Sequence, residues 1–350
     1  MAADGNAIPN LSRPIICVVG PTASGKSAIA QEIARRVGGE IISADSMQVY
    51  RGMDIGTGKL PPEERTVAHH GLDLVDPGMP YSVALYQEYA RQTAARLDAE
   101  GKRVILCGGT GFYIRSVIDG YSFPEGEQED NPVRQRYQVL LEEIGDQALW
   151  ERLQQVDPAS AAIIHPHNTR RVIRAFEMHE QGESYARQNA RLKEIPQVLP
   201  AVQIGLAVDR KALNARIDAR VDSMFASGLV DEVRSLLAAG FREALTAPKA
   251  IGYRQVVEAF DGRCTLSEAV EQTKIATHRY AKRQRSWFGR DARIHWIDAA
   301  LPGEAWGLSD ADIQDEMRKS PVVPPAARDI ASIADDALAV LATIDSTINS

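Results

Sequence analysis

Short apolar runs in the first third of the chain alternate with segments in which apolar residues recur at helical spacing. Runs rich in β-branched residues at 14–20, 40–44 and 103–107 predict buried strands. Between them, the spacing predicts one helix over 26–37 and a second helix that Ser82 caps and that runs to about 98. Strands and helices that alternate in this way form a parallel sheet with crossover helices, so the pattern indicates an α/β fold.

After the third strand the pattern changes to polar helical segments. One further strand is expected at 202–208, with helices over most of 211–298. We therefore predict an α/β core that is interrupted by a helical insertion domain and followed by an acidic tail. The predicted parts are the first part of the core at 10–122, the insertion domain at 123–200, the second and mostly helical part of the core at 201–298, and the tail at 299–350.

The tail contains several prolines and a possible helix near 328–344. We expect the tail to be dispensable for folding and chemistry, because none of the motifs described below extends beyond Asp298. The alternative is that this helix packs its apolar residues onto the core. Those residues are Ile330, Ile333, Leu338 and Leu341.

The composition is that of an ordinary globular protein, with 44% hydrophobic and 25% charged residues. Cys17, Cys107 and Cys264 lie far apart, which argues against a disulfide scaffold, a cysteine-only zinc site and a redox motif. No apolar stretch approaches the length of a transmembrane helix, and the N-terminus lacks the pattern of a signal peptide. We expect a soluble, cytoplasmic protein.

The formal charge of −7 conceals an uneven distribution. The tail has nine Asp and Glu against three Lys and Arg, which leaves the rest of the chain nearly neutral. The segment from Lys274 to Arg293 has seven Lys and Arg against one acid, Asp291. Such a basic patch is compatible with binding to a nucleic acid, whatever the net charge of the whole chain.

A glycine-rich loop follows the first strand and opens the first helix. Its sequence matches GxxxxGK[ST] and comprises Gly20, Pro21, Thr22, Ala23, Ser24, Gly25, Lys26 and Ser27. Backbone N–H groups of such a loop surround phosphate oxygens, and the lysine adds a full charge. The loop therefore predicts a di- or triphosphate ligand on a core like that of the P-loop NTPases, with Ser27 as a ligand to Mg²⁺.

Two further loops are expected at the same edge of the sheet, where the parallel strands end and where such folds bind ligands. The first, 45–50, begins with Asp45, a carboxylate suited to accept a proton or to bind metal-held water. In the same loop, Gln48 offers an amide that pairs with an adenine edge. The second, 108–111, contributes the hydroxyl of Thr110. The alternative for Asp45 is an Asx turn or a helix cap.

Two basic segments lie on predicted helices. Arg170, Arg171 and Arg174 are grouped in the insertion, and the first and last of them are one turn apart. The segment 274–288 mixes cations with aromatic residues, which suits contacts with phosphates and stacking on bases. The alternative is a solvated helix face, although the second segment has few acids to pair with its cations.

Eight motifs in order make the chain similar to the tRNA dimethylallyltransferases of bacterial type, also called tRNA isopentenyltransferases. The resemblance runs from about Pro14 to Asp298, and Leu60 and Ser286 are minor departures from the family's pattern. The motifs are GPTASGKS (20–27), DSMQVYRGMDIGTGK (45–59), HHGLDLVDP (69–77), GGTGFYI (108–114), DNPVRQRY (130–137), NTRRVIRAFE (168–177), KAIGYRQ (249–255) and AKRQRSWF (281–288).

This resemblance implies transfer of a dimethylallyl group from dimethylallyl diphosphate to N6 of the adenosine 3′ of the anticodon, with release of diphosphate. By similarity, the P-loop and Mg²⁺ hold the diphosphate, and Thr22 hydrogen-bonds its bridging oxygen. Asp45 is then expected to accept the proton from N6. Arg220, on the helix expected after the strand at 202–208, is a candidate second cation on the diphosphate.

The resemblance also implies that the target adenine is flipped out of the anticodon stem-loop into the protein. By similarity, Asp45, Ser46, Met47, Gln48 and Thr110 surround this base. Nothing in the sequence suggests an obligate dimer, and we expect a monomer. The residues expected to contact the surrounding RNA are Arg134, Arg170, Arg171, Val172, Ile173, Arg174, Lys249, Ala250, Ile251, Gly252, Tyr253, Arg254, Lys282, Arg283 and Arg285.

Two other functions stay open on the residues alone. A P-loop small-molecule kinase would use Asp45 as base and Ser27 with Mg²⁺, although the third strand ends in Cys107 rather than in the usual aspartate. A nucleotide-gated RNA-binding protein without catalysis would need only the basic segment. Entry of label from dimethylallyl diphosphate into unmodified tRNA, without ATP, distinguishes the prenyltransferase from both.

Overall fold

The computed structural model describes residues 8–123, 131–192, 194–244, 246–299 and 329–348. The chain divides into two compact units, one of Met1–Ile118 with Val198–Ser350 and one of Asp119–Gln197. The second unit contains the helical segments that we predict for the insertion at 123–200. The acidic stretch at the start of that insertion, 124–130, lies outside the described residues.

Six strands in the described part of the chain form one parallel sheet in the order β3-β2-β4-β1-β5-β6. They are β1 (Ile15–Val19), β2 (Gly39–Ser43), β3 (His69–His70), β4 (Arg103–Gly108), β5 (Ala201–Ala207) and β6 (Ile294–Asp298). Four of them confirm the predicted strands. The other two, β3 and β6, are edge strands that the sequence does not predict, and each pairs with a neighbour on one side only, β3 with β2 and β6 with β5.

The strand β1 is buried on both faces of the sheet. Ile15, Cys17 and Val19 belong to one apolar cluster, whereas Ile16 and Val18 belong to a second one. None of these five residues is more than 1% exposed. A continuous apolar run of this kind is typical of a parallel strand that is covered by helices on both sides.

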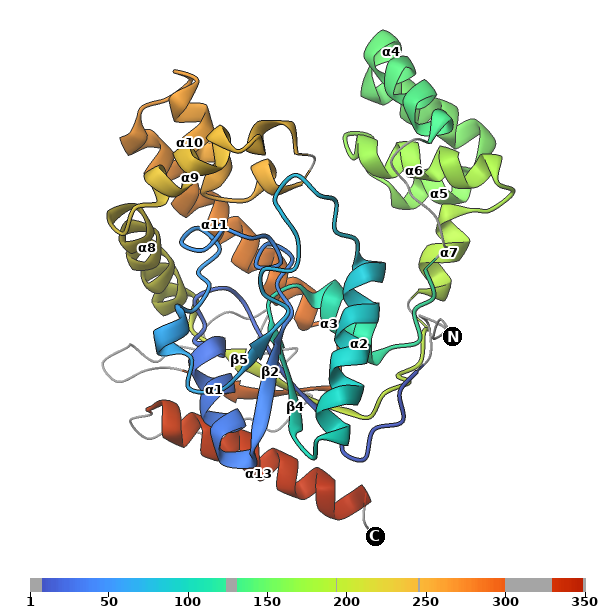
Figure 1. The fold of residues 1–350 in the computed structure, drawn as a ribbon. Coiled ribbons are helices and arrows are strands. Elements are labelled where there is room, and N and C mark those ends of the chain that lie inside the picture. Colours follow the sequence, from blue (N-terminus) through green and yellow to red (C-terminus); the bar gives the residue numbers. More distant parts are fainter. Residues whose placement is uncertain (1–7, 124–130, 193, 245, 300–328, 349–350) are drawn as a thin grey trace. The chain divides into compact units, whose positions relative to one another are not determined.

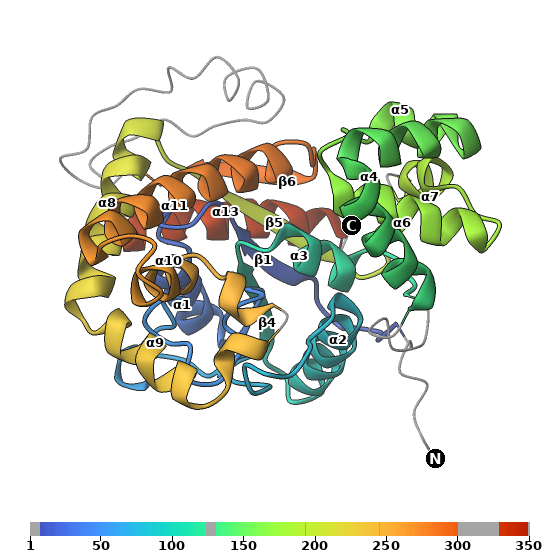
Figure 2. The same ribbon diagram turned by 90° about the horizontal axis from the view of Figure 1, so that it is seen from above.

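Helices cover both faces of this sheet (Figures 1 and 2). Residues of α2 and α3 pack in the cluster that contains Ile15, and residues of α1, α8 and α13 pack in the other. The helices of this unit are α1 (Lys26–Val37), α2 (Val83–Ala99), α3 (Gly111–Ile118), α8 (Arg210–Ala226), α9 (Leu229–Ala238), α10 (Tyr253–Phe260), α11 (Leu266–Phe288) and α13 (Ile330–Ile348), with 3₁₀ turns at Pro62–Glu64, Phe241–Glu243 and Ala247–Lys249. Among the helices of the described ranges, none combines the length and apolar character that crossing a membrane requires.

Both helices predicted for the first part of the core are present. The first, α1, covers the predicted residues, and the second, α2, begins directly after Ser82. The Ser82 Oγ accepts a hydrogen bond from the Leu85 N–H (3.2 Å), which is the cap that the sequence predicts.

Four helices make up the second unit as far as it is described. They are α4 (Pro132–Val156), α5 (Pro158–Ile163), α6 (Thr169–Glu180) and α7 (Tyr185–Arg191). Gly145, with a φ of 80°, interrupts α4. Leu149 and Leu153 of α4 pack with Val172 and Phe176 of α6 in an apolar core that belongs to this unit alone. A core of its own is what allows an insertion to form a compact unit.

The last helix, α13, packs on the core of the first unit, as the alternative to a dispensable tail expects. Ile333 is 0% exposed and Leu341 is 4% exposed, and both lie in the cluster that contains residues of α1. Leu338 packs partly against the same cluster, whereas Ile330 is 40% exposed. The helix runs beside α1 in Figure 1. Its apolar stripe therefore holds it on the core despite the negative charge of the tail, of which 300–328 lie outside the described residues.

We predict that Ile333→Ala lowers the free energy of unfolding by about 2–4 kcal/mol, because it leaves a cavity between α13 and α1. The same change at Ile330, on the same helix but exposed, is the matched control and should cost less than about 1 kcal/mol. Urea unfolding followed by circular dichroism measures both values. Equal and small losses would contradict the packing of α13.

Candidate functional site

The P-loop, residues 20–27, turns from β1 into α1. Gly25 occupies the N-cap position with φ 88° and ψ 8°, a left-handed conformation that residues with a Cβ rarely adopt. Ser24 Oγ and Lys26 Nζ both donate to the Pro21 carbonyl, which holds the loop in shape. Because the N-terminus of a helix attracts anions, this loop has the geometry of a phosphate-binding site.

Lys26 lies in a poorly solvated place among charged groups from other segments. Burial lowers the pKa of Lys26 to about 8; Arg220 of α8 acts in the same direction, while Cys107 and Asp45 act against it. Burial also lowers the pKa of Arg220, and Asp45 counteracts this effect. The Arg220 guanidinium reaches the Gly58 carbonyl (3.5 Å) as well. Two poorly solvated cations in one place favour the binding of a multiply charged anion.

Asp45 follows β2 at the carboxyl edge of the sheet, as the sequence predicts. Its Oδ1 accepts a hydrogen bond from the Met47 N–H (2.9 Å), so the Asx turn that we considered as an alternative is present. This bond fixes the carboxylate and is compatible with a role as a base. The Ser46 N–H donates to Thr110 Oγ1 (3.1 Å), and the Thr110 N–H donates to the Ala44 carbonyl (3.1 Å). The loops after β2 and β4 are therefore joined directly.

Gln48 lies between the sheet and the far end of its own loop. Its Oε1 accepts a hydrogen bond from Ser43 Oγ (2.8 Å), and its Nε2 donates to the Thr57 carbonyl (3.3 Å). The amide proposed to face an adenine is thus held in a defined orientation by the protein itself.

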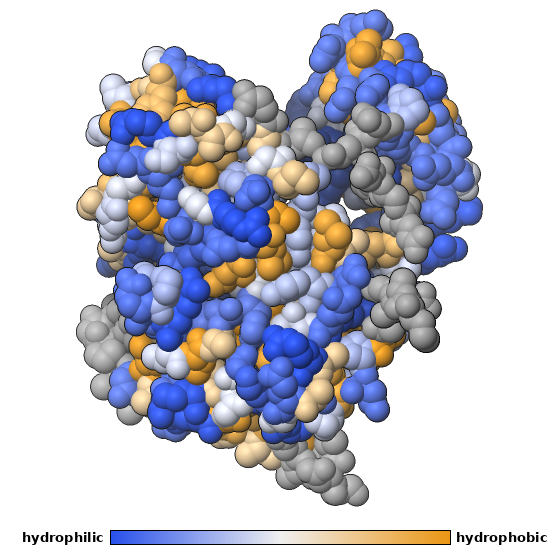
Figure 3. All heavy atoms as spheres, in the orientation of Figure 1, coloured by the Kyte–Doolittle hydropathy of each residue, from blue (hydrophilic) through white to orange (hydrophobic). Residues whose placement is uncertain are grey.

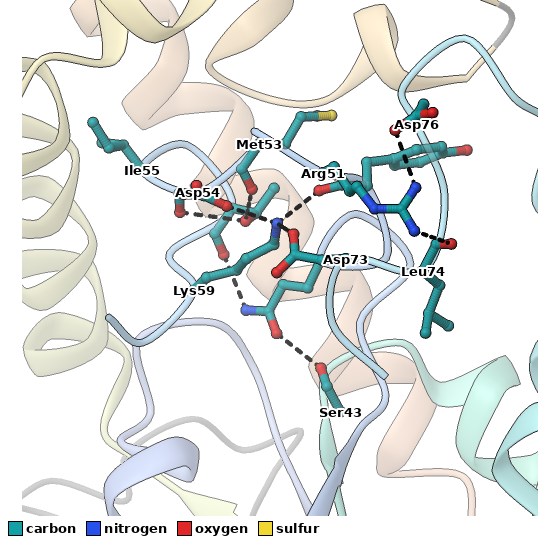
Figure 4. A network of polar contacts seen from close by, with 12 residues as sticks. Ser43, Arg51, Met53, Asp54, Ile55, Lys59, Asp73, Leu74 and Asp76 are labelled. Carbon is teal, nitrogen blue, oxygen red and sulfur yellow. Dashed lines mark hydrogen bonds and ion pairs between the residues drawn. The ribbon is translucent and has the colours of Figure 1, made fainter. Parts of the chain in front are cut away.

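A buried lysine, which the sequence analysis did not single out, holds the loop after β2 together (Figure 4). Lys59 Nζ donates to the Tyr50 carbonyl (2.6 Å) and to the carboxylates of Asp54 (2.7 Å) and Asp73 (2.5 Å). Its side chain is only 3% exposed. Its place at the end of the motif 45–59 was visible in the sequence, but the approach of Asp73 depends on the fold.

Glu232 of α9 binds the same loop from outside, and no local pattern in the sequence indicated it. Its carboxylate accepts hydrogen bonds from the N–H groups of Asp54 (3.0 Å), Ile55 (2.8 Å) and Gly56 (3.2 Å). It also accepts one from the Tyr253 hydroxyl (2.6 Å). The α9–α10 region therefore helps to fix the loop that carries Asp45 and Gln48. In Figure 1 this loop rises from the sheet toward α9 and α10.

The helix α11 carries the basic segment predicted to contact RNA. Its C-terminal half and the following residues line an open cavity of about 450 Å³, in which Trp287 is 42% exposed. The lining residues are Arg279, Lys282, Arg283, Ser286, Trp287 and Arg290. Cations and an exposed indole in one cavity suit a phosphate with a neighbouring base. Arg285, by contrast, is only partly exposed and has an interaction within the protein.

The other predicted RNA contacts differ in exposure. In the second unit, Arg170 and Arg171 are exposed, whereas Arg134 and Arg174 pair with the buried carboxylate of Glu177 (2.6 and 3.0 Å). Two members of this segment, Val172 and Ile173, are buried in the core of the unit. In the segment 249–254, Lys249 and Arg254 are exposed and Ile251 is partly exposed. The other three residues are buried, namely Ala250, Gly252 and Tyr253. Side-chain contacts with a partner are thus confined to the exposed members.

Hydrophobic residues also lie beside the charged site. On the face that Figure 3 shows, hydrophilic residues cover most of the first unit, and hydrophobic ones gather in its middle, below α9 and α10. Met47 and Ile55, from the loop after β2, are only partly buried against the core. Because Met47 is two residues from Asp45, apolar and charged side chains adjoin each other here.

Two protein-family models match the chain, IPP transferase over residues 48–291 and isopentenyl transferase over residues 14–72. Among curated proteins, the chain is 48% identical to the tRNA dimethylallyltransferase of Kineococcus radiotolerans over 299 residues, which cover 83% of this chain and 92% of that protein. It is 49% identical to the tRNA dimethylallyltransferase of Streptomyces coelicolor over 289 residues, which cover 82% and 91% of the two chains.

Solved structures agree with these relatives. The full-length tRNA isopentenylpyrophosphate transferase of Bacillus halodurans is 35% identical, with a TM-score of 0.60, and the match covers 93% of this chain and 98% of that one. A eukaryotic dimethylallyltransferase acting on tRNA is 25% identical, with a TM-score of 0.67, and the match covers 88% and 77% of the two chains. These structures confirm the predicted α/β core like that of the P-loop NTPases.

We predict that the affinity for methyl diphosphate falls as the pH rises through about 8, the pKa of Lys26 in the free protein. Below this pH Lys26 carries its positive charge; above it the amine is neutral and must take up a proton to attract the anion. The affinity should therefore fall by up to about tenfold for each further pH unit. Isothermal titration calorimetry at constant ionic strength measures this slope.

Lys26→Met is the control for this titration. The variant should bind methyl diphosphate weakly and with little dependence on pH in the same range, because the titrating charge is gone. A wild-type affinity that stays constant well above pH 8 would contradict the assignment of the slope to Lys26.

Proposed function

The chain belongs to the IPP transferase family, and we infer that it is a tRNA dimethylallyltransferase, an enzyme that transfers a prenyl group to tRNA. The observation that carries this conclusion is the meeting of Lys26, Arg220 and Asp45 at the carboxyl edge of the sheet. Two cations suit the diphosphate of dimethylallyl diphosphate, and the carboxylate suits the amine that replaces it. The proposed acceptor is N6 of the adenosine 3′ of the anticodon.

In the proposed reaction, N6 attacks the first carbon of the dimethylallyl group, and the bond from this carbon to the bridging oxygen breaks. Negative charge then builds up on the diphosphate that leaves. Lys26, Arg220 and the N–H groups of the P-loop are suited to stabilise this charge, because poorly solvated donors act strongly on charge that develops beside them. We propose that the Thr22 hydroxyl donates to the bridging oxygen.

Asp45 is the proposed base. As the new C–N bond forms, a proton leaves N6 and passes to the Asp45 carboxylate, which the Met47 N–H holds in place. Ser46 and Thr110, which join the two loops, are proposed to lie against the adenine. Met47 and Gln48 complete this proposed site on the same loop.

The proposed cofactor is Mg²⁺. Ser27 is exposed at the start of α1, and no group of three His, Cys, Asp or Glu residues in the described ranges is arranged to hold a metal ion. A single serine hydroxyl fits an ion that takes most of its ligands from diphosphate and water, with Ser27 as the protein ligand. Such an ion would neutralise part of the charge on the leaving group.

We propose that exposed basic residues bind the anticodon stem-loop. Lys282 and Arg283 on α11 lie beside Trp287 in one cavity, and Arg170 and Arg171 are exposed in the second unit. An adenine stacked within the anticodon loop is out of reach of Asp45, which is only partly exposed, so the target base must be flipped out. A monomeric state and a cytoplasmic location stay predictions.

The family favours the prenyltransferase over the two alternatives from the sequence. A kinase would need a second carboxylate for its metal, whereas β4 ends with Cys107 and Gly108. Burial raises the pKa of the Cys107 thiol to about 11, so this residue stays protonated and offers no thiolate ligand at neutral pH. A binding protein without catalysis would have no use for the arrangement of Asp45 beside two poorly solvated cations.

Transfer of label from dimethylallyl diphosphate into unmodified tRNA, with Mg²⁺ and without ATP, tests the proposed function directly. Asp45→Asn should lower kcat by about 10²–10⁴-fold, because the amide keeps an acceptor for the Met47 N–H but does not accept the proton. Binding of dimethylallyl diphosphate should change little. Absence of labelled RNA with the wild type would exclude the function, and a near-normal kcat in the variant would exclude Asp45 as the base.

The double variant Lys282→Gln, Arg283→Gln should bind tRNA more weakly and with a shallower dependence on salt. The slope of log affinity against log salt concentration should change by about 0.7–0.9 for each phosphate contact that is lost. Arg96→Gln, which removes an exposed charge of α2 outside every motif, is the control. If the double variant keeps both the affinity and the slope of the wild type, this part of α11 is a solvated surface.

A further inference from the structure

A glutamine on α11 bridges two of the loops that form the site. The Oε1 of Gln284 accepts a hydrogen bond from the Thr22 N–H of the P-loop (2.8 Å). Its Nε2 donates to the Gly109 carbonyl in the turn after β4 (2.8 Å). The residue is 5% exposed, so water does not readily replace either bond. Gln284 thus binds one residue that lies 262 positions before it in the sequence and another that lies 175 positions before it.

Only an amide satisfies both partners at once. The Thr22 N–H needs an acceptor and the Gly109 carbonyl needs a donor, which fixes the orientation of the Gln284 amide. A carboxylate at position 284 would accept from Thr22 but would face the carbonyl with a second oxygen. An apolar side chain would leave both backbone groups without a partner in a buried place.

Gly109 is part of the same arrangement. A Cβ added to Gly109 would lie 2.2 Å from the Nε2 of Gln284, so any other residue there would push the amide away. One turn before Gln284 on α11, Tyr280 contacts the side chain of Thr110. Three residues after Gln284, the indole of Trp287 lies 2.0 Å from where a Cβ on Gly111 would be. The helix therefore meets three successive residues of this turn.

We propose that Gln284 is a positioning residue that sets the separation of the P-loop from the turn carrying Thr110. This inference rests on the proposed function, in which Thr22 acts on the leaving diphosphate and Thr110 lies against the adenine. Holding the two loops with one rigid amide aligns the breaking C–O bond with the attacking N6. Small errors in such an alignment are costly to the rate of a reaction between two bound substrates.

The test compares the same substitution at two glutamines of α11. Gln284→Met removes both amide bonds and should lower kcat by about 100-fold, with the KM of each substrate changed by less than about threefold. Gln272→Met, at an exposed position of the same helix, should have the kcat of the wild type. Gln284→Glu should also lose most of its kcat, because it lacks the donor for Gly109. A normal kcat in either variant at position 284 would overturn the proposal, as would a loss expressed wholly in the KM of one substrate.

Hydrogen–deuterium exchange gives a second result that needs no substrate. In Gln284→Met, amides of residues 20–27 and 108–112 should exchange faster together, while the rest of the sheet and the thermal midpoint stay close to the wild type. In Gln272→Met neither segment should change. Unchanged exchange at both segments would overturn the bridge even if transfer of label to tRNA were absent, so failure of this inference is distinct from failure of the proposed function.

Discussion

Burial of a parallel sheet on both faces is the constraint on which the site depends. Because β1, β2 and β4 run in one direction between two layers of helices, the loops that follow them leave the sheet at a single edge. The P-loop, the loop of Asp45 and the turn of Thr110 are therefore neighbours, although they are far apart in the sequence. The helix α13 packs with α1 in one of these two layers, and α1 is the helix that the P-loop opens.

Charge at this edge is arranged for a ligand rather than for stability. Burial lowers the pKa of both Lys26 and Arg220. The negative charge of Asp45 acts on both groups in the opposite direction. A diphosphate would supply the negative charge that these cations lack, and the attraction would be strong because little water screens it. In the proposed reaction, Asp45 beside these two cations would take the proton of the attacking amine, so binding and chemistry would share one group of charged side chains.

The sequence predicts what short-range patterns determine. The P-loop, four strands, α1 and the cap of α2 follow from apolar spacing, glycine and Ser82, and Asp45 follows from its position after a strand. Edge strands, the docking of α13 and the partners of Lys59 depend on segments that only the fold brings together. The exposure of a side chain also depends on the fold. The motif around Arg170 does not show that Arg174 pairs with Glu177, whose carboxylate is buried.

Loops that carry function have few backbone partners of their own, since they leave the sheet to reach a ligand. In this protein, polar side chains from distant elements supply those partners. Glu232 binds three consecutive N–H groups of one loop, and Gln284 binds an N–H and a carbonyl of two others. Each of these bonds gives a partner to a backbone group of a loop. α9 and α11 therefore hold loops of the candidate site through side chains that need not touch a substrate. On this proposal, precision at the reacting atoms would depend on contacts between helices and loops that are far apart in the sequence.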